Sequence, residues 1–451
     1  MNEFRLLLFL LLFSLELLAQ NKDKSKIGIQ EVVIVKSYSP SLNEVFKIKT
    51  NPRVPDSVYT SKKNVSYKIL NVPVISTFQP NKASPLKLKQ RKPSSAFNTI
   101  FSGAYGNKNQ LFLNVSNVTE IDRNQRFGIR FYKDGFSNNI NNTLLKSNQN
   151  YSDFGLNHNL RSSDYNVNTH FKFTSNINNY YGLSGNSLDT FFLRNINPEI
   201  RRNNLKIRTH WNWYNFFLRS FEFQANITSD NFNTVEQQIA LKNNFDFDLG
   251  AGKLKGELKL FGFNTNFESS YYEKNILEFT QGLGAFDLLW QLYKNNFKIK
   301  IGAGASYILG VEKISNNLVY YPQVEFLYEK PGNILLPYLK GNGGVTLNTY
   351  SSLTKENPYL APTSNLIPSF SKYNLNIGIR SRLASVLNFD MGFIFDEIEN
   401  FDFFERLPFD NENNLISYRL SNSFQSNYLD ANLYGFRASI RIDLIKDNFV
   451  F

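Results

Sequence analysis

The sequence predicts an all-β fold, a transmembrane antiparallel β-barrel of about 16 strands with an extended N-terminal arm. Three observations lead to this prediction. Long segments alternate apolar with polar residues, aromatic residues are abundant, and an apolar run near the N-terminus is typical of a secretion signal. A strand number of roughly 14–18 lies within the known size range of such barrels.

The clearest alternating segment is 297–309, with the sequence FKIKIGAGASYIL. Ile299 and Ile301 fall on one face of this segment if it is a strand, whereas Lys298 and Lys300 fall on the other. A side-chain period of two residues is strand geometry. The length suits a tilted strand that crosses a bilayer, which needs about 9–11 residues. The same pattern recurs in 204–215, 373–383 and 433–445.

The composition agrees with a membrane barrel and argues against other classes. Of 451 residues, 42 are Phe and 24 are Tyr, an excess that aromatic girdles at the bilayer interfaces would use. Cysteine is absent, so disulfide and thiolate chemistry are excluded. The formal net charge is +12, but Lys and Arg alternate with apolar residues and form no dense tract. We therefore expect no nucleic-acid partner and interpret the charge as a solvated face.

Three regions follow one another along the chain. Residues 1–19 resemble a signal peptide, because an apolar run over 6–15 precedes Ala19 as a plausible cleavage point. The alternative is a membrane anchor, but the run is shorter than the ~20 residues of a spanning helix. Residues 20–95, rich in Lys, Ser and Pro, are expected to form a periplasmic arm or a plug remnant. Residues 96–451 are expected to form an outer-membrane β-barrel.

The alternating segments define the expected strands and their connections. Candidate strands are 97–106, 110–119, 125–133, 151–161, 165–175, 204–215, 219–228, 235–249, 253–267, 277–293, 296–310, 318–329, 333–347, 373–383, 386–397 and 433–445, with a weaker one near 415–425. Some connections are tight, such as 294–295, whereas 134–150, 176–203, 348–372 and 398–414 are long and polar. Short turns at one rim and long loops at the other are typical of outer-membrane barrels. A soluble sandwich or solenoid remains an alternative, although it rarely needs strands this long.

Basic residues on the polar face of the strands are expected to line the lumen. Charge in a wet lumen costs little, whereas Arg or Lys on the lipid face near the midplane costs roughly 2–4 kcal/mol. The expected lumen-lining basic residues are Arg126, Arg130, Lys206, Arg208, Lys298, Lys300, Arg380, Arg382, Arg437 and Arg441. A net basic lumen favours anionic solutes.

Residue patterns for catalysis and metal binding are missing from the sequence. The chain has three histidines and no HExxH or GxSxG motif. His170 and His210 are expected to face the lumen, where a metal-binding pair is one alternative and two polar lumen residues are the other. We therefore expect no enzyme, no catalytic residues, no metal site and no cofactor.

Two stretches resemble outer-membrane barrels of the Bacteroidota that are TonB-dependent-receptor-like and plug-poor. One is the arm, with EVVIVKSYSPSLNEVFKIKTNPRVPDSV (31–58) and YKILNVPVISTFQP (67–80). The other is ENPYLAPTSNLIPSFSKYNLNIGIRSRL (356–383), which precedes and enters a barrel strand. The resemblance implies a barrel in the cell outer membrane and names no substrate. The chain departs from full TonB-dependent receptors, because its arm is too short for their plug domain.

The segment Glu31, Val32, Val33, Ile34 and Val35 resembles a TonB box, which pairs as an added strand with the energy-coupling protein TonB. β-Branched residues favour the extended backbone that such pairing needs. The alternative is an ordinary strand in the mouth of the barrel. Expected partners are therefore outer-membrane lipid and TonB or other envelope proteins. The expected function is solute uptake across the outer membrane; the alternative is a non-transporting barrel that recruits partners in an envelope assembly complex.

Overall fold

The computed structural model describes residues 64–68, 98–183, 195–269, 277–311, 317–330, 332–382, 387–409, 416–445 and 449–450. Residues 64–68 are exposed and form no helix or strand. The other described ranges form one antiparallel sheet. The TonB-box-like segment, residues 31–35, lies outside the described residues, as does the predicted signal peptide. Within the described ranges, no helix is both long and apolar enough to cross a membrane.

Sixteen long strands build the sheet, and each pairs antiparallel with the next one along the chain. Their bounds are β1 Thr99–Gly106, β2 Gln110–Asp122, β3 Gln125–Phe136, β4 Gln149–Arg161, β5 Tyr165–Asn179, β6 Glu199–Trp213, β7 Leu218–Asp230, β8 Val235–Leu249, β9 Gly252–Phe267, β10 Leu277–Lys294, β11 Phe297–Leu309, β12 Leu318–Tyr328, β13 Leu335–Thr346, β14 Ser369–Arg382, β15 Leu387–Arg406 and β16 Phe424–Ile445. The short elements are β17 Phe449–Val450, α3 Tyr350–Glu356 and the 3-10 turns η2 Asn107–Asn109 and η3 Ser417–Arg419.

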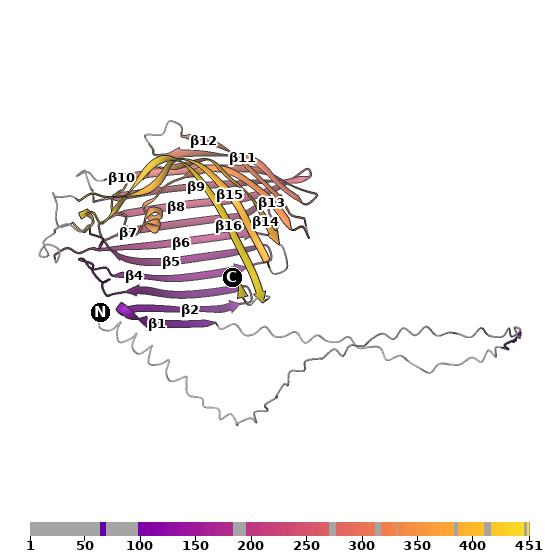
Figure 1. The fold of residues 1–451 in the computed structure, drawn as a ribbon, viewed down its shortest axis with the longest axis horizontal. Coiled ribbons are helices and arrows are strands. Elements are labelled where there is room, and N and C mark those ends of the chain that lie inside the picture. Colours follow the sequence, from indigo (N-terminus) through magenta and orange to yellow (C-terminus); the bar gives the residue numbers. More distant parts are fainter. Residues whose placement is uncertain are drawn as a thin grey trace, which may run out of the picture. The chain divides into compact units, whose positions relative to one another are not determined.

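The sheet curls round, so that β14, β15 and β16 cross in front of earlier strands in Figure 1. Its strands carry the 16-strand antiparallel order that the sequence predicts, which confirms the all-β barrel class. The weaker candidate near 415–425 is wrong as a separate strand, because these residues form η3 and the start of β16. The predicted loop 398–414 is also wrong in its first part, since β15 continues to Arg406.

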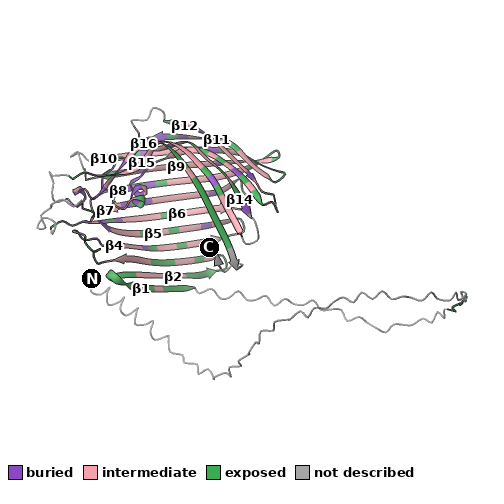
Figure 2. Cartoon of the chain, viewed as in Figure 1, coloured by how far each residue is buried: buried purple, intermediate pink, exposed green. Residues whose placement is uncertain are grey.

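The alternation of side chains is visible in the exposure of β11. Ile301 and Leu309 are exposed on the outer face, whereas Ser306 and Ile308 between them are buried on the inner face. Ile377 and Ile440, which the same pattern places on the outer face, are exposed as well. A row of exposed apolar side chains on long strands is what contact with lipid requires. In Figure 2 exposed residues run along β1 and β16, while buried residues gather on β7, β8 and the helix.

Short turns and long connections lie at opposite ends of the strands. The β10–β11 turn contains Asn295 and Asn296, both at positive φ (49° and 67°), as a type I′ hairpin turn needs. The predicted turn at 294–295 therefore lies one residue further along. The connections β3–β4, β5–β6, β13–β14 and β15–β16 are long and share the other end of the strands. This arrangement agrees with the rim asymmetry that the sequence predicts.

One long connection is not the polar rim loop that the sequence suggests. Residues 347–368, which we call the strap, connect β13 with β14 and pack against the sheet. Tyr350, Leu360 and Ala361 of the strap are fully buried. Leu353 and Leu366 join a core with Phe263 and other side chains of β9–β11. The prediction for 348–372 was wrong because apolar strap residues bury surface against distant strands, which a local pattern does not reveal.

Candidate functional site

The inner face of the sheet is the one that the strap covers, and the register identifies the residues on it. Gln238 of β8 donates to Thr349 of the strap, and Gln281 of β10 donates to the Leu366 carbonyl. Gln238 pairs across the ladder with Asn226, and Asn226 pairs with Lys206. Paired residues in a sheet point to the same face. Lys206 therefore lies on the inner face.

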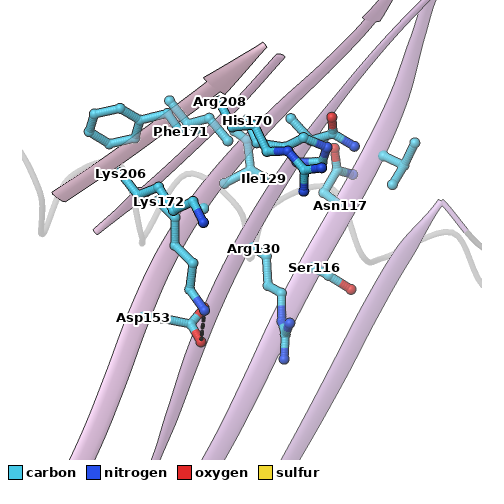
Figure 3. Close-up of a pocket in the computed structure, with 15 residues that line it drawn as sticks. Ser116, Asn117, Ile129, Arg130, Asp153, His170, Phe171, Lys172, Lys206 and Arg208 are labelled. Atoms are coloured by element: carbon cyan, nitrogen blue, oxygen red, sulfur yellow. Dashed lines mark ion pairs between the residues drawn. The ribbon is translucent and has the colours of Figure 1, made fainter. Parts of the chain in front are cut away.

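The same row continues across the first strands of the sheet. Lys206 pairs with Lys172 of β5, Lys172 with Gly155 of β4, and Gly155 with Arg130 of β3. Arg208, two residues after Lys206, lies opposite His170 of β5. Successive inner-face positions thus bring the cations Arg130, Lys172, Lys206 and Arg208 onto neighbouring strands, which we call the basic cluster (Figure 3).

A recess opens in the wall beside the basic cluster. Its volume is about 480 Å³, and β2–β6 line it. Gly128 and Gly155 lie in its floor, and a Cβ atom on Gly155 would meet nothing nearer than the Phe171 carbonyl oxygen at 3.8 Å. Two glycines on adjacent strands leave room that side chains would otherwise fill. The recess is therefore large enough for a small solute and is bordered by cationic side chains.

Few carboxylates face these cations in the described part of the sheet. Asp153 is buried and pairs with Lys172, whose Nζ lies 3.5 Å from its carboxylate oxygen (Figure 3). Glu222 of β7 pairs with Arg208 at 2.6 Å. Among the described residues, Arg130 and Lys206 make no ion pair with a carboxylate, and Arg130 instead lies over the Tyr132 ring. The cluster keeps a positive surplus that favours anions.

The two histidines lie near this cluster but do not face each other. His210 Nδ1 is 3.2 Å from Glu222, and its Nε2 is 2.9 Å from Asn212 Oδ1. His170 lines the recess with Arg208. The described residues hold no group of three or more His, Cys, Asp or Glu side chains that suits a metal ion. The contacts of His210 with Glu222 and Asn212 are those of a polar side chain on the inner face.

The remaining predicted basic residues form two further groups on the inner face. Lys298 and Lys300 of β11 share Glu325 of β12, at 3.9 Å and 2.7 Å. Arg380 and Arg437 share Asp390, at 3.1 Å and 3.7 Å, and both contact Tyr338. In these two groups every cation contacts a carboxylate that it shares with a second cation, whereas Arg130 and Lys206 of the basic cluster contact no carboxylate of the described residues.

Three predicted positions lie outside these groups. Arg126, in phase with Arg130, pairs with Glu120 at 2.9 Å near the start of β3. Arg441 lies in the last part of β16, where it pairs across the ladder with Asn388. Arg382 ends β14, and its side chain lies outside the described residues. That the ten positions line a lumen stays a prediction.

The strap is fixed to the wall at both ends of its helix. Glu236 of β8 is fully buried and accepts hydrogen bonds from the Tyr350 and Ser351 amides, at 2.7 Å and 2.8 Å. Thr349 caps the helix by accepting from the Ser352 amide. The first amides of α3, which have no partner inside a helix, are thereby satisfied, and the carboxylate faces the positive end of the helix dipole.

The other end of α3 lies over β6. Arg202, also buried, donates to the carbonyls of Pro358 and Leu360, at 2.6 Å and 2.8 Å, and to the Tyr350 hydroxyl at 3.1 Å. Burial raises the pKa of Tyr350 well above its usual value, so its phenol stays neutral and donates to Asp230. The helix ends at Asn357, whose extended backbone is favoured before Pro358.

Sequence reasoning missed the residues that hold the strap. Glu236 and Arg202 follow the polar phase of their strands, so alternation predicts their face but not their partners. The Thr-x-x-Ser spacing of residues 349–352 was a visible capping signal. Lys172 and Asp153 follow the same alternation as the predicted basic residues.

Solved structures share this fold over most of the chain. The FrpB iron transporter of Neisseria meningitidis is 9% identical, with a TM-score of 0.53, and the match covers 75% of this chain and 58% of that one. The siderophore receptor PirA of Pseudomonas aeruginosa is 13% identical, with a TM-score of 0.52, covering 77% of this chain and 63% of that one. The ferric enterobactin receptor PfeA of the same organism is 10% identical (TM-score 0.52; 77% and 60% covered).

The chain therefore shares its fold with these solved proteins. It spans about three fifths of the length of these three proteins. No protein-family model and no curated protein matches its sequence. The likeness therefore concerns the fold, and the chemistry of the site comes from the residues of this chain.

Proposed function

We propose that this chain is a non-enzymatic outer-membrane β-barrel that takes up an anionic solute across the outer membrane. The observation that carries the proposal is the basic cluster, in which Arg130 and Lys206 border a recess on the inner face and make no ion pair with a carboxylate of the described residues. Rings of Arg and Lys select anions in pores. The names of the solved neighbours, an iron transporter, a siderophore receptor and a ferric enterobactin receptor, agree with uptake as the general role.

The finer parts of the proposal rest on sequence motifs. Residues 1–19 act as a signal peptide, 20–95 as a periplasmic arm or plug remnant, and 96–451 as the barrel. The motifs at 31–58 and 356–383 support an affiliation with plug-poor Bacteroidota barrels. Glu31–Val35 would offer an edge for strand addition to TonB, with outer-membrane lipid around the barrel.

Ion selectivity in a planar bilayer tests the proposed function. The full chain, inserted between unequal KCl solutions, is expected to give a reversal potential that shows anion preference. Replacing Arg130, Lys206 and Arg208 together by Gln is expected to shift this potential toward zero, because the cations that attract chloride are gone. The matched control replaces Lys300 and Glu325 together by Gln, which removes an ion pair and leaves the net charge of the inner face unchanged. Cation preference, or no conductance, would contradict the proposal.

A deletion separates uptake from the scaffold alternative. Without residues 20–95, loss of solute uptake with partner co-purification intact favours transport. Loss of co-purified envelope proteins, with solute movement unchanged, favours a barrel that recruits partners.

A further inference from the structure

We propose that Lys355, on the strap helix, faces the basic cluster and makes the site specific for solutes with two or more anionic groups. This inference rests on the proposed function, since it concerns the same site. The wall supplies cations from one side only. A cation on the strap would supply positive charge from the opposite side, so that one solute could bind between the strap and the wall.

The path of α3 brings its last turn close to the cluster. The helix begins at β8, where Glu236 and Gln238 bind its N-terminal end, and it reaches β6, where Arg202 binds Pro358. Arg202 and Lys206 lie on the same strand and the same face, four residues apart, which is roughly 13 Å. Lys355 immediately precedes the end of the helix and therefore lies near β6.

The helix also sets the direction in which Lys355 points. Tyr350, Ser351, Leu353 and Thr354 are buried against the wall and the strap core. Lys355 is exposed, and it lies near enough to Lys206 for their charges to interact. No ion pair joins Lys355 to a carboxylate of the described residues. Its ammonium group thus faces the interior space beside the basic cluster.

The acidic residue next to Lys355 does not neutralise this arrangement. Burial and the negative charge of Asp402 on β15 raise the pKa of Glu356. The charged neighbour of Glu356 is therefore Asp402 of β15. The carboxylates that face the cluster from the wall are Asp153 and Glu222, each already paired with one cation.

Two separated groups of cations select by the number of charges on the solute. A singly charged anion contacts the wall cations or Lys355, whereas a solute with two phosphate or carboxylate groups contacts both at once. When one molecule makes charge-assisted contacts on both sides, the second contact is intramolecular and does not cost the entropy of binding a second molecule. The expected solute class is therefore a small polyanion, with pyrophosphate and citrate as probes of its phosphate and carboxylate forms.

Calorimetric titration of the full chain in detergent micelles tests the inference. Wild type is expected to bind pyrophosphate or citrate about tenfold more tightly than inorganic phosphate or acetate, respectively. Lys355→Gln is expected to remove most of this preference, and Lys355→Arg to restore it. Lys330→Gln, which removes an exposed lysine from the β12–β13 turn at the opposite rim, is the matched control and should change nothing. The polyanion that binds more tightly shows whether the site prefers phosphate or carboxylate groups.

The outcomes separate the inference from the proposed function. If wild type binds none of the four anions, the proposed function fails. If wild type binds them and Lys355→Gln keeps the full preference for polyanions, the inference alone is overturned. Protease resistance of the strap in each variant, equal to wild type, ensures that the loss comes from the charge and not from a displaced helix.

Discussion

At the scale of single residues, the buried carboxylate of Glu236 accepts four hydrogen bonds. It accepts from Tyr350 and Ser351 of the strap and from Gln238 and Thr265 of the wall. A buried carboxylate is tolerated only when its oxygens are fully paired. Glu236 is therefore the residue on which the position of the strap depends most.

Glu236→Gln is expected to loosen the strap while the barrel stays folded. One carboxylate oxygen is replaced by an amide nitrogen, which donates hydrogen bonds and does not accept them. The two donors that this oxygen served lose their partner, which destabilises the packed strap by about 2–3 kcal/mol. Limited proteolysis should then cut within residues 347–368, where wild type resists. Gln237→Asn, on the outer face of the same strand, is the matched control and should leave the strap resistant to protease.

The outward direction of Ile301 gives a second residue-scale prediction. Ile301 is 55% exposed on the outer face of β11. Ile301→Lys should lower the free energy of unfolding in lipid bilayers by roughly 2–4 kcal/mol, because a charge would meet acyl chains. Ile301→Leu should be neutral within about 1 kcal/mol. An equal effect of both substitutions, measured by urea titration, would contradict the lipid-facing assignment.

At the scale of elements, the recess depends on the lack of side chains in β3 and β4. Gly155→Leu is expected to fill the recess and weaken anion binding about tenfold, since the added atoms occupy the space beside Lys172 and Lys206. Gly262→Leu is the matched control. That glycine lies on the outer face of β9, and a Cβ atom on it would meet nothing nearer than the Gln281 carbonyl oxygen at 3.7 Å. Titration that shows equal binding by both variants would place the solute elsewhere.

The strands could be predicted from the sequence, but the strap could not. Alternation over 297–309 identifies β11 and its two faces because period two is a local property of extended backbone. The partners of Tyr350, by contrast, are Glu236 and Arg202, more than a hundred residues away. Polar residues and prolines in 348–372 suggest a loop, and nothing local states which apolar side chains the loop buries. The candidate site was thus half predicted: its wall, but not its strap.

At the scale of the whole molecule, cations outnumber carboxylates in each charged group of the inner face described above. The groups around Glu325 and Asp390 are paired, whereas Arg130 and Lys206 are not paired with carboxylates of the described residues. One positive region lies along β3–β6, where Arg130 and Lys206 border the recess. An entering anion would be drawn to that side.

Anion binding is consequently expected to depend on salt. Raising NaCl from 50 mM to 500 mM should weaken citrate binding at least several-fold, because screening acts on partly exposed charges such as Arg208. The same titration in sodium sulfate should weaken binding further, since a divalent anion competes for the cluster. Affinity that does not change with salt would contradict an electrostatic site.

The strap has a mechanical consequence, because it is continuous with two wall strands. Its ends run directly into β13 and β14. A segment built this way is tethered on both sides, so it cannot leave the inner face of the sheet as a separate body. Any widening must come from hinge motion within some twenty residues or from release of the Glu236 and Arg202 anchors. The space inside the sheet would then widen by rotation of a segment that stays attached to two wall strands.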